Sequence, residues 1–214
     1  MATSTGFGPK KAYLILYNAV SAIAWTAVLG RVALVFFWKG AFFVPLVVDN
    51  FARITQTCAV MEILHALTGV VPAPVFTTGM QVASRLFLMW AVCFPFPQLN
   101  TSPFYSSMLA AWGLTEVMRY SYFALKQVDA VPAWLHWLRY SAFLVLYPVG
   151  ISSEVAMTLL ALWGPAGDLA AWYPFALVAV LTSYVPGSVI LYGHMLKQRK
   201  KYLGAGKTSQ KKTQ

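Results

Sequence analysis

Two ionisable side chains, Tyr147 and Glu154, lie seven residues apart in the apolar stretch RYSAFLVLYPVGISSEVAMT. Seven residues make close to two helical turns at ~3.6 residues per turn, so the phenol and the carboxylate share one face of a helix. Gly150 lies between them and leaves a place without a side chain. A carboxylate inside a bilayer costs roughly 2.5 kcal/mol or more on insertion scales, which makes Glu154 a candidate functional residue. The pair is typical of a proton-transfer site.

The alternative interpretation of this pair is structural. In that case the Tyr147 phenol makes a hydrogen bond within the protein, and Glu154 forms an ion pair with Arg85 or Arg119. Pro148 favours the functional interpretation, because a proline within a span frees a backbone carbonyl one turn earlier and kinks the helix. Such kinks often adjoin cavities.

Other polar residues inside apolar stretches are paired at helical spacing: Glu62 with His65, Gln81 with Arg85, and Glu116 with Arg119. Residues three or four apart are neighbours on a helix surface, and polar groups in lipid must be satisfied within the protein. These pairs therefore either hold a helix bundle together or assist a reaction. We expect His65 to be a hydrogen-bonding partner of Glu62, while Arg85 could bind a phosphate or polarise a carbonyl group.

Metal and cysteine chemistry find no support in the sequence. Three scattered histidines cannot supply the clusters of a membrane di-iron enzyme, so we expect neither a metal nor a cofactor. A cysteine phosphatase needs an arginine six residues after the cysteine, but Leu64 follows Cys58 at that spacing and Leu99 follows Cys93. We expect both cysteines to be small buried hydrophobic residues. No G-x-S-x-G nucleophile elbow is present.

The composition identifies the class of protein that must position these groups. Of 214 residues, 59% are hydrophobic and only 10% are charged, the mean hydropathy is +0.63, and soluble proteins have about 25% charged residues. The sequence predicts a polytopic membrane protein. The net charge of +10 is concentrated in the carboxyl-terminal tail rather than along a soluble surface with exposed aromatic residues, so we expect no nucleic-acid partner.

Apolar stretches predict an all-α bundle of six transmembrane helices, each matched to a hydrocarbon thickness of ~30 Å. The predicted spans are approximately residues 12–30, 54–71, 78–94, 104–125, 138–162 and 172–194. Residues 31–53, interrupted by Lys39, Gly40 and Pro45, are expected to form an interfacial or re-entrant connection. Basic residues flank both ends of the chain, which places both termini in the cytosol. Residues 1–214 form one membrane domain, with flexible basic tails at about 1–11 and 197–214.

The segment YPVGISSE, preceded by Arg139 and Tyr140, resembles the very-long-chain (3R)-3-hydroxyacyl-CoA dehydratases, a family once called protein tyrosine phosphatase-like. The resemblance extends to Glu62, to QVASR in the third span and to TEVMRY in the fourth. It implies a lyase that converts 3-hydroxyacyl-CoA to trans-2-enoyl-CoA in the third step of fatty-acid elongation. It assigns catalysis to Tyr147 and Glu154. The supporting or substrate-binding residues are Glu62, Gln81, Arg85, Arg119, Arg139 and Gly150.

The reaction needs a base for the α-proton of the thioester and an acid for the leaving hydroxyl group. Our hypothesis is that Glu154 takes the proton and that Tyr147, or a water it orients, protonates the hydroxyl. The opposite assignment, and both transfers by Glu154, stay open. Arg85 could stabilise enolate charge. From a span that begins at Leu138, Tyr147 is ~14 Å deep and Glu154 ~24 Å deep, which places Glu154 beyond the midplane.

Lys211 and Lys212 occupy the positions of a dilysine retrieval signal, which favours the endoplasmic reticulum membrane. The expected partners are an acyl-CoA substrate, membrane lipids and the other elongation enzymes: condensing enzyme, 3-ketoacyl-CoA reductase and enoyl-CoA reductase. The competing hypotheses are a non-enzymatic lipid carrier or assembly factor whose polar pairs only hold the bundle, and a membrane isomerase that uses the same acid–base pair. Acyl-chain length and oligomeric state have no signal in the sequence.

Overall fold

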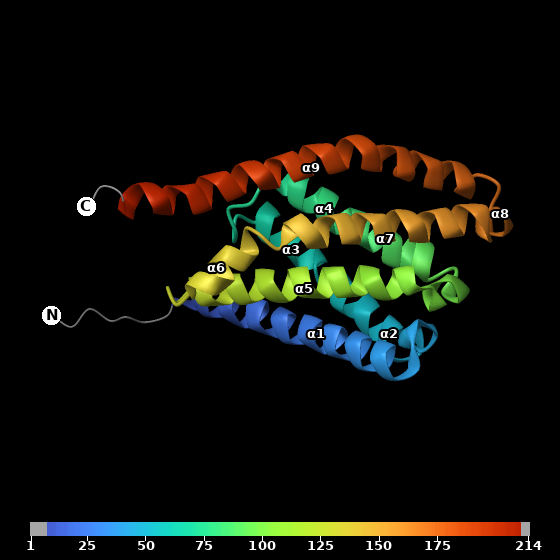
Figure 1. The fold of residues 1–214 in the computed structure, drawn as a ribbon, viewed down its shortest axis with the longest axis horizontal. Helices are drawn as coiled ribbons and strands as arrows, with labels where there is room; N and C mark the ends of the chain where they lie inside the picture. Colours follow the sequence, from blue (N-terminus) through green and yellow to red (C-terminus); the bar gives the residue numbers. More distant parts are fainter. Residues whose placement is uncertain (1–7, 211–214) are drawn as a thin grey trace.

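The long apolar stretches of the chain form helices in the computed structural model, which describes residues 8–210 and the side chains up to residue 203 (Figure 1). No strand occurs within residues 8–210. The helices are α1 (Pro9–Lys39), α2 (Val44–Thr57), α3 (Val60–Leu67), α4 (Val75–Phe87), α5 (Pro103–Lys126), α6 (Ala133–Arg139), α7 (Phe143–Trp163), α8 (Ala166–Leu169) and α9 (Tyr173–Gln210). A π-helical segment, Leu88–Cys93, continues α4. The expected all-α class is confirmed.

The helices run back and forth along one axis (Figure 1). Helices α1, α4 and α7 run in one direction, and α2–α3, α5 and α9 return. The start of α1, the end of α9 and helix α6 therefore lie at the same end of the bundle, called the terminal end below. The turn after α1 and helix α8 lie at the opposite end, called the far end.

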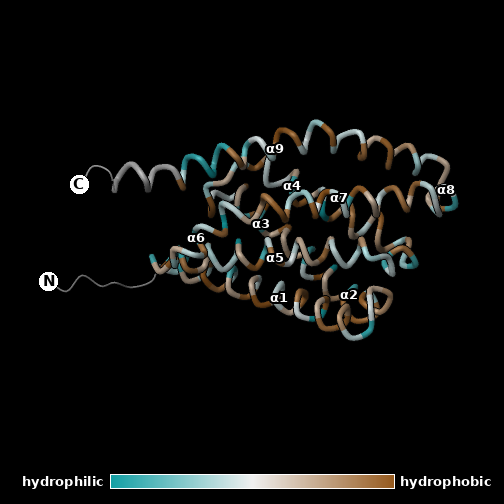
Figure 2. Tube along the Cα trace, in the orientation of Figure 1, coloured by the Kyte–Doolittle hydropathy of each residue, from teal (hydrophilic) through white to brown (hydrophobic). Residues whose placement is uncertain are grey.

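Four helical segments are long and apolar enough to cross a membrane: Pro9–Lys39, Val75–Cys93, Phe143–Trp163 and Tyr173–Leu203. Apolar residues predominate along these segments, whereas the last coloured turns of α9 are hydrophilic (Figure 2). The other two predicted spans correspond to α2–α3 and α5. A break divides α2 from α3, and α5 is a central helix that packs on both α1 and α7 and buries polar side chains among them.

The connection expected over residues 31–53 is different in the structure. Helix α1 continues to Lys39, and a turn follows at Gly40, whose φ of +87° suits a residue without a Cβ. Helix α2 then starts at Val44 with Pro45 in its first turn, where a missing backbone N–H is tolerated. The segment that was expected to connect two spans is therefore mostly helical. Its charge, glycine and proline were expected to interrupt regular structure, but Gly40 and Pro45 only shape the turn between two helices.

Other boundaries and burials also depart from expectation. Helix α1 begins at Pro9 and α9 continues to Gln210, so much of the basic tail expected from residue 197 is helical. Lys211 and Lys212 lie outside the described residues. Cys93 is buried as expected, but Cys58 is exposed because it lies at the break between α2 and α3.

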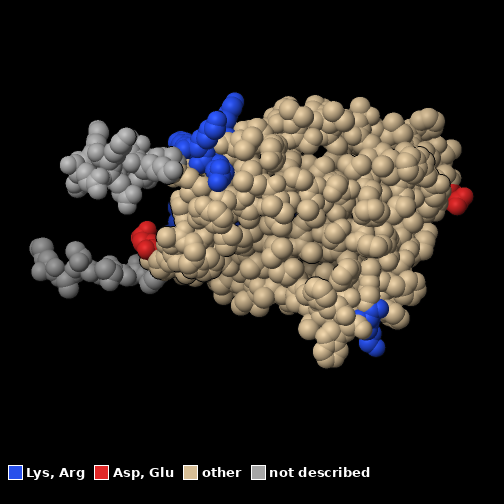
Figure 3. Space-filling model, in the orientation of Figure 1, with Lys and Arg blue, Asp and Glu red and all other residues tan. Residues whose placement is uncertain are grey.

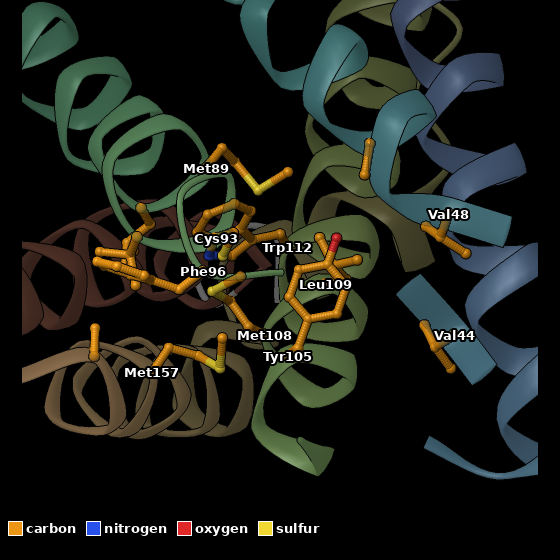
Figure 4. Packing of buried hydrophobic residues seen from close by; sticks show 14 of the residues in the cluster. Val44, Val48, Met89, Cys93, Phe96, Tyr105, Met108, Leu109, Trp112 and Met157 are labelled. Atoms are coloured by element: carbon orange, nitrogen blue, oxygen red, sulfur yellow. The ribbon is translucent and has the colours of Figure 1, made fainter. Parts of the chain in front are cut away.

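Helix α5 supplies the centre of the core (Figure 4). Its residues Tyr105, Met108, Leu109 and Trp112 meet side chains from α2, α7 and the π-helical segment. On the α1 side, a Cβ at Gly113 would lie 3.2 Å from the Leu29 Cβ, so the missing side chain allows α1 and α5 to approach closely. The core therefore fixes α5 between α1 and α7, and α5 in turn positions the polar groups described next.

Candidate functional site

The carboxylate of Glu154 is held by one donor on each side. The indole Nε1 of Trp112 in α5 donates to Oε1 at 2.7 Å, and the hydroxyl of Tyr184 in α9 donates to Oε2 at 2.8 Å. Both donors are neutral, and none of the described ion pairs includes Glu154. The carboxylate is thus oriented by two hydrogen bonds without a neutralising cation. This arrangement suits a group that exchanges protons rather than one that only bridges helices.

Tyr147 lies on the same face of α7 as Glu154, two turns earlier in the helix. Its hydroxyl donates to the backbone oxygen of Ser188 at 3.2 Å, and its ring stacks on Tyr192 with centroids 5.7 Å apart. Tyr184, Ser188 and Tyr192 are spaced four residues apart, so they form one stripe along α9. Both Tyr147 and Glu154 contact this stripe, which agrees with the shared helix face expected from their spacing.

A charge-balanced network lies beside this site and joins α3, α4 and α5. Glu116 accepts hydrogen bonds from Arg85 and from Arg119. The Arg119 guanidinium also donates to both oxygens of Glu62, at 2.7 and 2.6 Å, and Tyr120 donates to Glu62 as well. The pairing of Glu116 with Arg119 within α5 is as expected. Two arginines therefore balance two glutamates, and neither arginine pairs with Glu154 as the structural alternative supposed.

The network reaches the candidate pair through one residue. The Arg85 guanidinium carbon lies 5.2 Å from the centroid of the Trp112 ring, whose N–H binds Glu154. A cation over an indole face is an attractive contact, and it orients the ring. Arg85 therefore lies near Glu154 but forms its ion pair with Glu116. The indole ring of Trp112 lies between its positive charge and the Glu154 carboxylate.

The remaining predicted residues are Gln81, Gly150 and Arg139, of which only Gly150 lies on α7 between Tyr147 and Glu154. Gln81 is exposed on α4, one turn from Arg85, and no side-chain hydrogen bond joins the two among those described. Gly150 is buried against Ala111 of α5, and a Cβ there would lie at 3.8 Å, an ordinary contact distance. Arg139 lies on α6 at the terminal end. The structure thus gathers Tyr147, Glu154 and Arg85 in one region and sets Gln81 and Arg139 apart from them.

His65 was expected to bind Glu62, and that expectation is wrong. Its Nε2 makes a 2.7 Å hydrogen bond with the Tyr13 hydroxyl, and its ring packs edge-on against Tyr17 with centroids 4.8 Å apart. Because they are three residues apart, His65 and Glu62 are neighbours on α3. However, the His65 side chain faces α1, whereas the Glu62 carboxylate forms hydrogen bonds with Arg119.

Sequence reasoning missed Trp112 and Tyr184, the two donors to Glu154. Both look like ordinary apolar aromatic residues in the sequence. One signal was present for Tyr184: it lies in the middle of the predicted span 172–194, whereas interfacial tyrosines gather at span ends. A phenol at mid-span needs a hydrogen-bond partner, and an unassigned carboxylate on another span is a suitable acceptor.

Removal of one charge from the network should destabilise the protein. We expect Glu116→Gln to cost about 3–5 kcal/mol, because Arg85 and Arg119 are then left with one carboxylate between them. The double variant Arg85→Gln/Glu116→Gln restores the balance and should recover part of the loss. Denaturant unfolding of the purified protein in detergent measures both. Gln81→Ala on the exposed face of α4 serves as the control, and a Glu116→Gln protein as stable as the wild type would contradict the pairing.

Comparisons with known proteins place this chain in a family. The family model described as protein tyrosine phosphatase-like protein, PTPLA, matches residues 56–205. A probable very-long-chain (3R)-3-hydroxyacyl-CoA dehydratase of Schizosaccharomyces pombe is 40% identical over 199 residues, which cover 90% of this chain and 93% of the relative. PASTICCINO 2 of Arabidopsis thaliana, with the same activity in its name, is 38% identical over 92% of this chain and 96% of its own. Human very-long-chain (3R)-3-hydroxyacyl-CoA dehydratase 2 is 32% identical over 90% of this chain and 81% of its own. No solved structure matches the chain.

Proposed function

Since this chain belongs to the protein tyrosine phosphatase-like (PTPLA) family, whose curated relatives are very-long-chain (3R)-3-hydroxyacyl-CoA dehydratases, we propose that it dehydrates 3-hydroxyacyl-CoA with Tyr147 and Glu154 as the catalytic pair. The observation that supports this pair best is the Glu154 carboxylate, which Trp112 and Tyr184 orient without a cation. The phosphatase in the family description is a name only, because neither cysteine is followed by an arginine six residues later.

The proposed reaction is an elimination. A base takes a proton from the α-carbon of the thioester, the freed electron pair forms the new double bond, and the bond from the β-carbon to its hydroxyl breaks. An acid supplies the proton with which the hydroxyl departs as water. We assign the base to Glu154 and the acid to Tyr147 or a water that it orients, with the reverse assignment as the alternative. Arg85 lies close enough to stabilise enolate charge through the electrostatic field of the site.

The depth of the pair suits a substrate with a long acyl chain. Helix α7 begins at Phe143 rather than at Leu138, so Glu154 is the twelfth of its 21 residues. At ~1.5 Å per residue it lies ~16 Å from the start of the helix, close to the middle of a ~30 Å hydrocarbon layer. Tyr147 lies nearer to the terminal end. A thioester at this depth leaves the acyl chain among the apolar helices toward the far end.

Topology and location belong to the same proposal. Six crossings, by α1, α2–α3, α4 with its π-helical extension, α5, α7 and α9, follow if the bundle axis is the membrane normal. The terminal end carries the lysines that begin α1 and those that end α9, so the positive-inside rule puts it in the cytosol. Endoplasmic reticulum residence, with Lys211 and Lys212 as the retrieval signal, and association with the other elongation enzymes complete the proposal.

Turnover by the purified protein tests the function directly. We expect the wild type to convert a long-chain (3R)-3-hydroxyacyl-CoA to the trans-2-enoyl-CoA, with loss of one water measured by mass spectrometry, and to discriminate against the 3S epimer. The epimer presents its hydroxyl on the opposite face, away from the acid. A lipid carrier or assembly factor would bind the thioester and return it unchanged, and that result would overturn the proposal.

A further inference from the structure

Arg139 ends helix α6 at the terminal end with its guanidinium packed on aromatic rings. Its guanidinium carbon lies 4.6 Å from the ring centroid of Tyr122 and 4.5 Å from that of Phe123. Its Nε is buried and has no hydrogen-bond acceptor among the described residues. Burial lowers the pKa of this guanidinium. The guanidinium also has a side-chain hydrogen bond with Tyr140, so the unpaired group is the Nε–H alone. Because a buried N–H without an acceptor is costly, this N–H suits an acceptor that a ligand supplies.

A second arginine and a pair of stacked rings adjoin this position. The Nε of Arg199 in α9 donates a hydrogen bond to the hydroxyl of Ser141 at 3.4 Å. Ser141 follows Arg139 by two residues. The rings of Tyr140 and Tyr202 stack with centroids 4.7 Å apart and planes 17° apart. The end of α9 is therefore joined to the turn before α7 by a hydrogen bond and by an aromatic stack.

The surrounding charge is mainly positive, although Asp129 in the connection between α5 and α6 lies at the same end. The basic residues here form none of the described ion pairs. None of the ion pairs within the described residues includes Arg139, Arg199 or the lysines near them. Blue side chains gather where α9 leaves the bundle, while nearly all of the visible surface along the helices is uncharged (Figure 3). The lysines of this segment are Lys197, Lys200 and Lys201. A multiply charged anion is the ligand that this end attracts most strongly.

We infer that the terminal end binds the 3′-phosphorylated ADP part of coenzyme A, with Arg139 and Arg199 on its phosphates and the Tyr140–Tyr202 stack against its adenine. This inference rests on the proposed function. Arginine suits the phosphates because its planar fork matches their oxygens. A stacked tyrosine pair suits the base because every nucleobase offers a flat face to an aromatic ring.

The distance to the catalytic pair agrees with the length of the coenzyme. Helix α7 begins at Phe143, just after Tyr140, and Tyr147 and Glu154 follow Phe143 by four and eleven residues, which is ~6 and ~16 Å along the helix axis. The pantetheine arm contains about as many backbone bonds as four peptide residues, and four residues extend to at most ~14 Å. A nucleotide at Arg139 and Tyr140 therefore delivers the thioester between Tyr147 and Glu154. The two sites are separated by the length of the substrate's own arm.

An anionic lipid headgroup also carries phosphate, so the experiment must separate the two sources. The full-length protein is placed in nanodiscs of neutral phosphatidylcholine, and one 3-hydroxyacyl group is supplied as its CoA thioester or as its pantetheine thioester. The variants are Arg199→Ala and Arg139→Lys. The control is Lys39→Ala, because Lys39 is a basic residue at the far end of the bundle.

We expect both arginine variants to raise the KM for the CoA thioester about tenfold, because each variant loses one charge-assisted contact with the substrate. The kcat should stay within about twofold of the wild-type value. Both constants for the pantetheine thioester should stay unchanged, since that substrate lacks the nucleotide. Lys39→Ala should change neither substrate's constants. Free 3′,5′-ADP should compete with the CoA thioester in the wild type and compete more weakly in Arg199→Ala.

Three outcomes would overturn the inference. Equal losses on both thioesters would mean that the arginines only support the fold, and an unchanged KM would mean that they do not touch the coenzyme. Failure of 3′,5′-ADP to compete, together with a response of the variants to added phosphatidylserine, would assign the site to a lipid headgroup. If the wild type dehydrates neither thioester, the proposed function fails, and direct titration of 3′,5′-ADP into wild type and Arg199→Ala still decides this site.

Discussion

Glu154→Gln is expected to lower kcat for dehydration about 10³-fold while leaving the protein folded, because an amide cannot accept the α-proton and general acid–base catalysis contributes 10²–10⁴-fold. The substitution keeps the size of the side chain. The amide oxygen of the glutamine can still accept a hydrogen bond from Trp112 or from Tyr184. The amide nitrogen is itself a donor, and it then faces the other of these two donors. Conversion of 3-hydroxyacyl-CoA to enoyl-CoA under substrate saturation measures the effect.

Ser152→Ala is the matched control for this variant. Ser152 is exposed on the same helix, two residues before Glu154, and its hydroxyl donates only to the backbone oxygen of Val149, at 3.1 Å, among the described contacts. Its removal should leave kcat unchanged. If Glu154→Gln turned over substrate at the wild-type rate, Glu154 would be a structural residue. If it lost its cooperative unfolding transition, the loss of activity would carry no mechanistic information, and Glu154→Asp would then test the same carboxylate in a folded protein.

Tyr147→Phe is expected to lower kcat about 10²-fold, since it removes a proton donor and leaves the ring in place. The phenylalanine ring can still stack on Tyr192, so the loss reports on the hydroxyl alone. The hydrogen bond to the Ser188 backbone oxygen is lost as well, at a cost to stability of about 1 kcal/mol. Saturating turnover and thermal unfolding of the same preparation separate the two effects.

The partner in the stack provides the control for Tyr147. Tyr192→Phe removes a hydroxyl from the same aromatic pair, four residues after Ser188, and it leaves the proposed acid untouched. Its kcat should stay within about twofold of the wild type, as for a surface change away from the reacting atoms. Comparable losses in both variants would show that the pair matters through packing, and the catalytic assignment of Tyr147 would fall.

The sequence was most informative where a single helix decides the answer. The apolar stretches predict the all-helical class, and spacing alone predicts that Glu116 binds Arg119 and that Tyr147 and Glu154 share a face. Each of these depends on the geometry of one α-helix, which is the same in every protein. The Arg139–Thr158 stretch that carries the proposed catalytic pair was likewise recognisable, because a carboxylate in so apolar a segment stands out.

Contacts between helices could not be predicted in the same way. Glu62 turns to Arg119 rather than to His65, because α5 brings a guanidinium to it from 57 positions away in the chain. The donors to Glu154 come from α5 and α9, and no local pattern marks Trp112 as one of them. Irregular segments were also hard to interpret: Gly40 and Pro45 read as an interruption, although helix continues on both sides of the turn.

The balanced network of α3, α4 and α5 also bears on how the protein is made. Synthesis proceeds from the amino terminus, so Glu62 and Arg85 leave the ribosome before Glu116 and Arg119 exist. Buried ionisable groups are expensive in lipid until they are paired. If these helices cross the membrane as proposed, the α3–α4 segment is expected to stay at the insertion machinery, or in contact with water, until α5 arrives with the matching charges. In the proposed six-crossing topology, membrane entry of these three helices is expected to be one concerted event. A ribosome stalled before residue 116 is then expected to leave an insertion intermediate that is open to quality control.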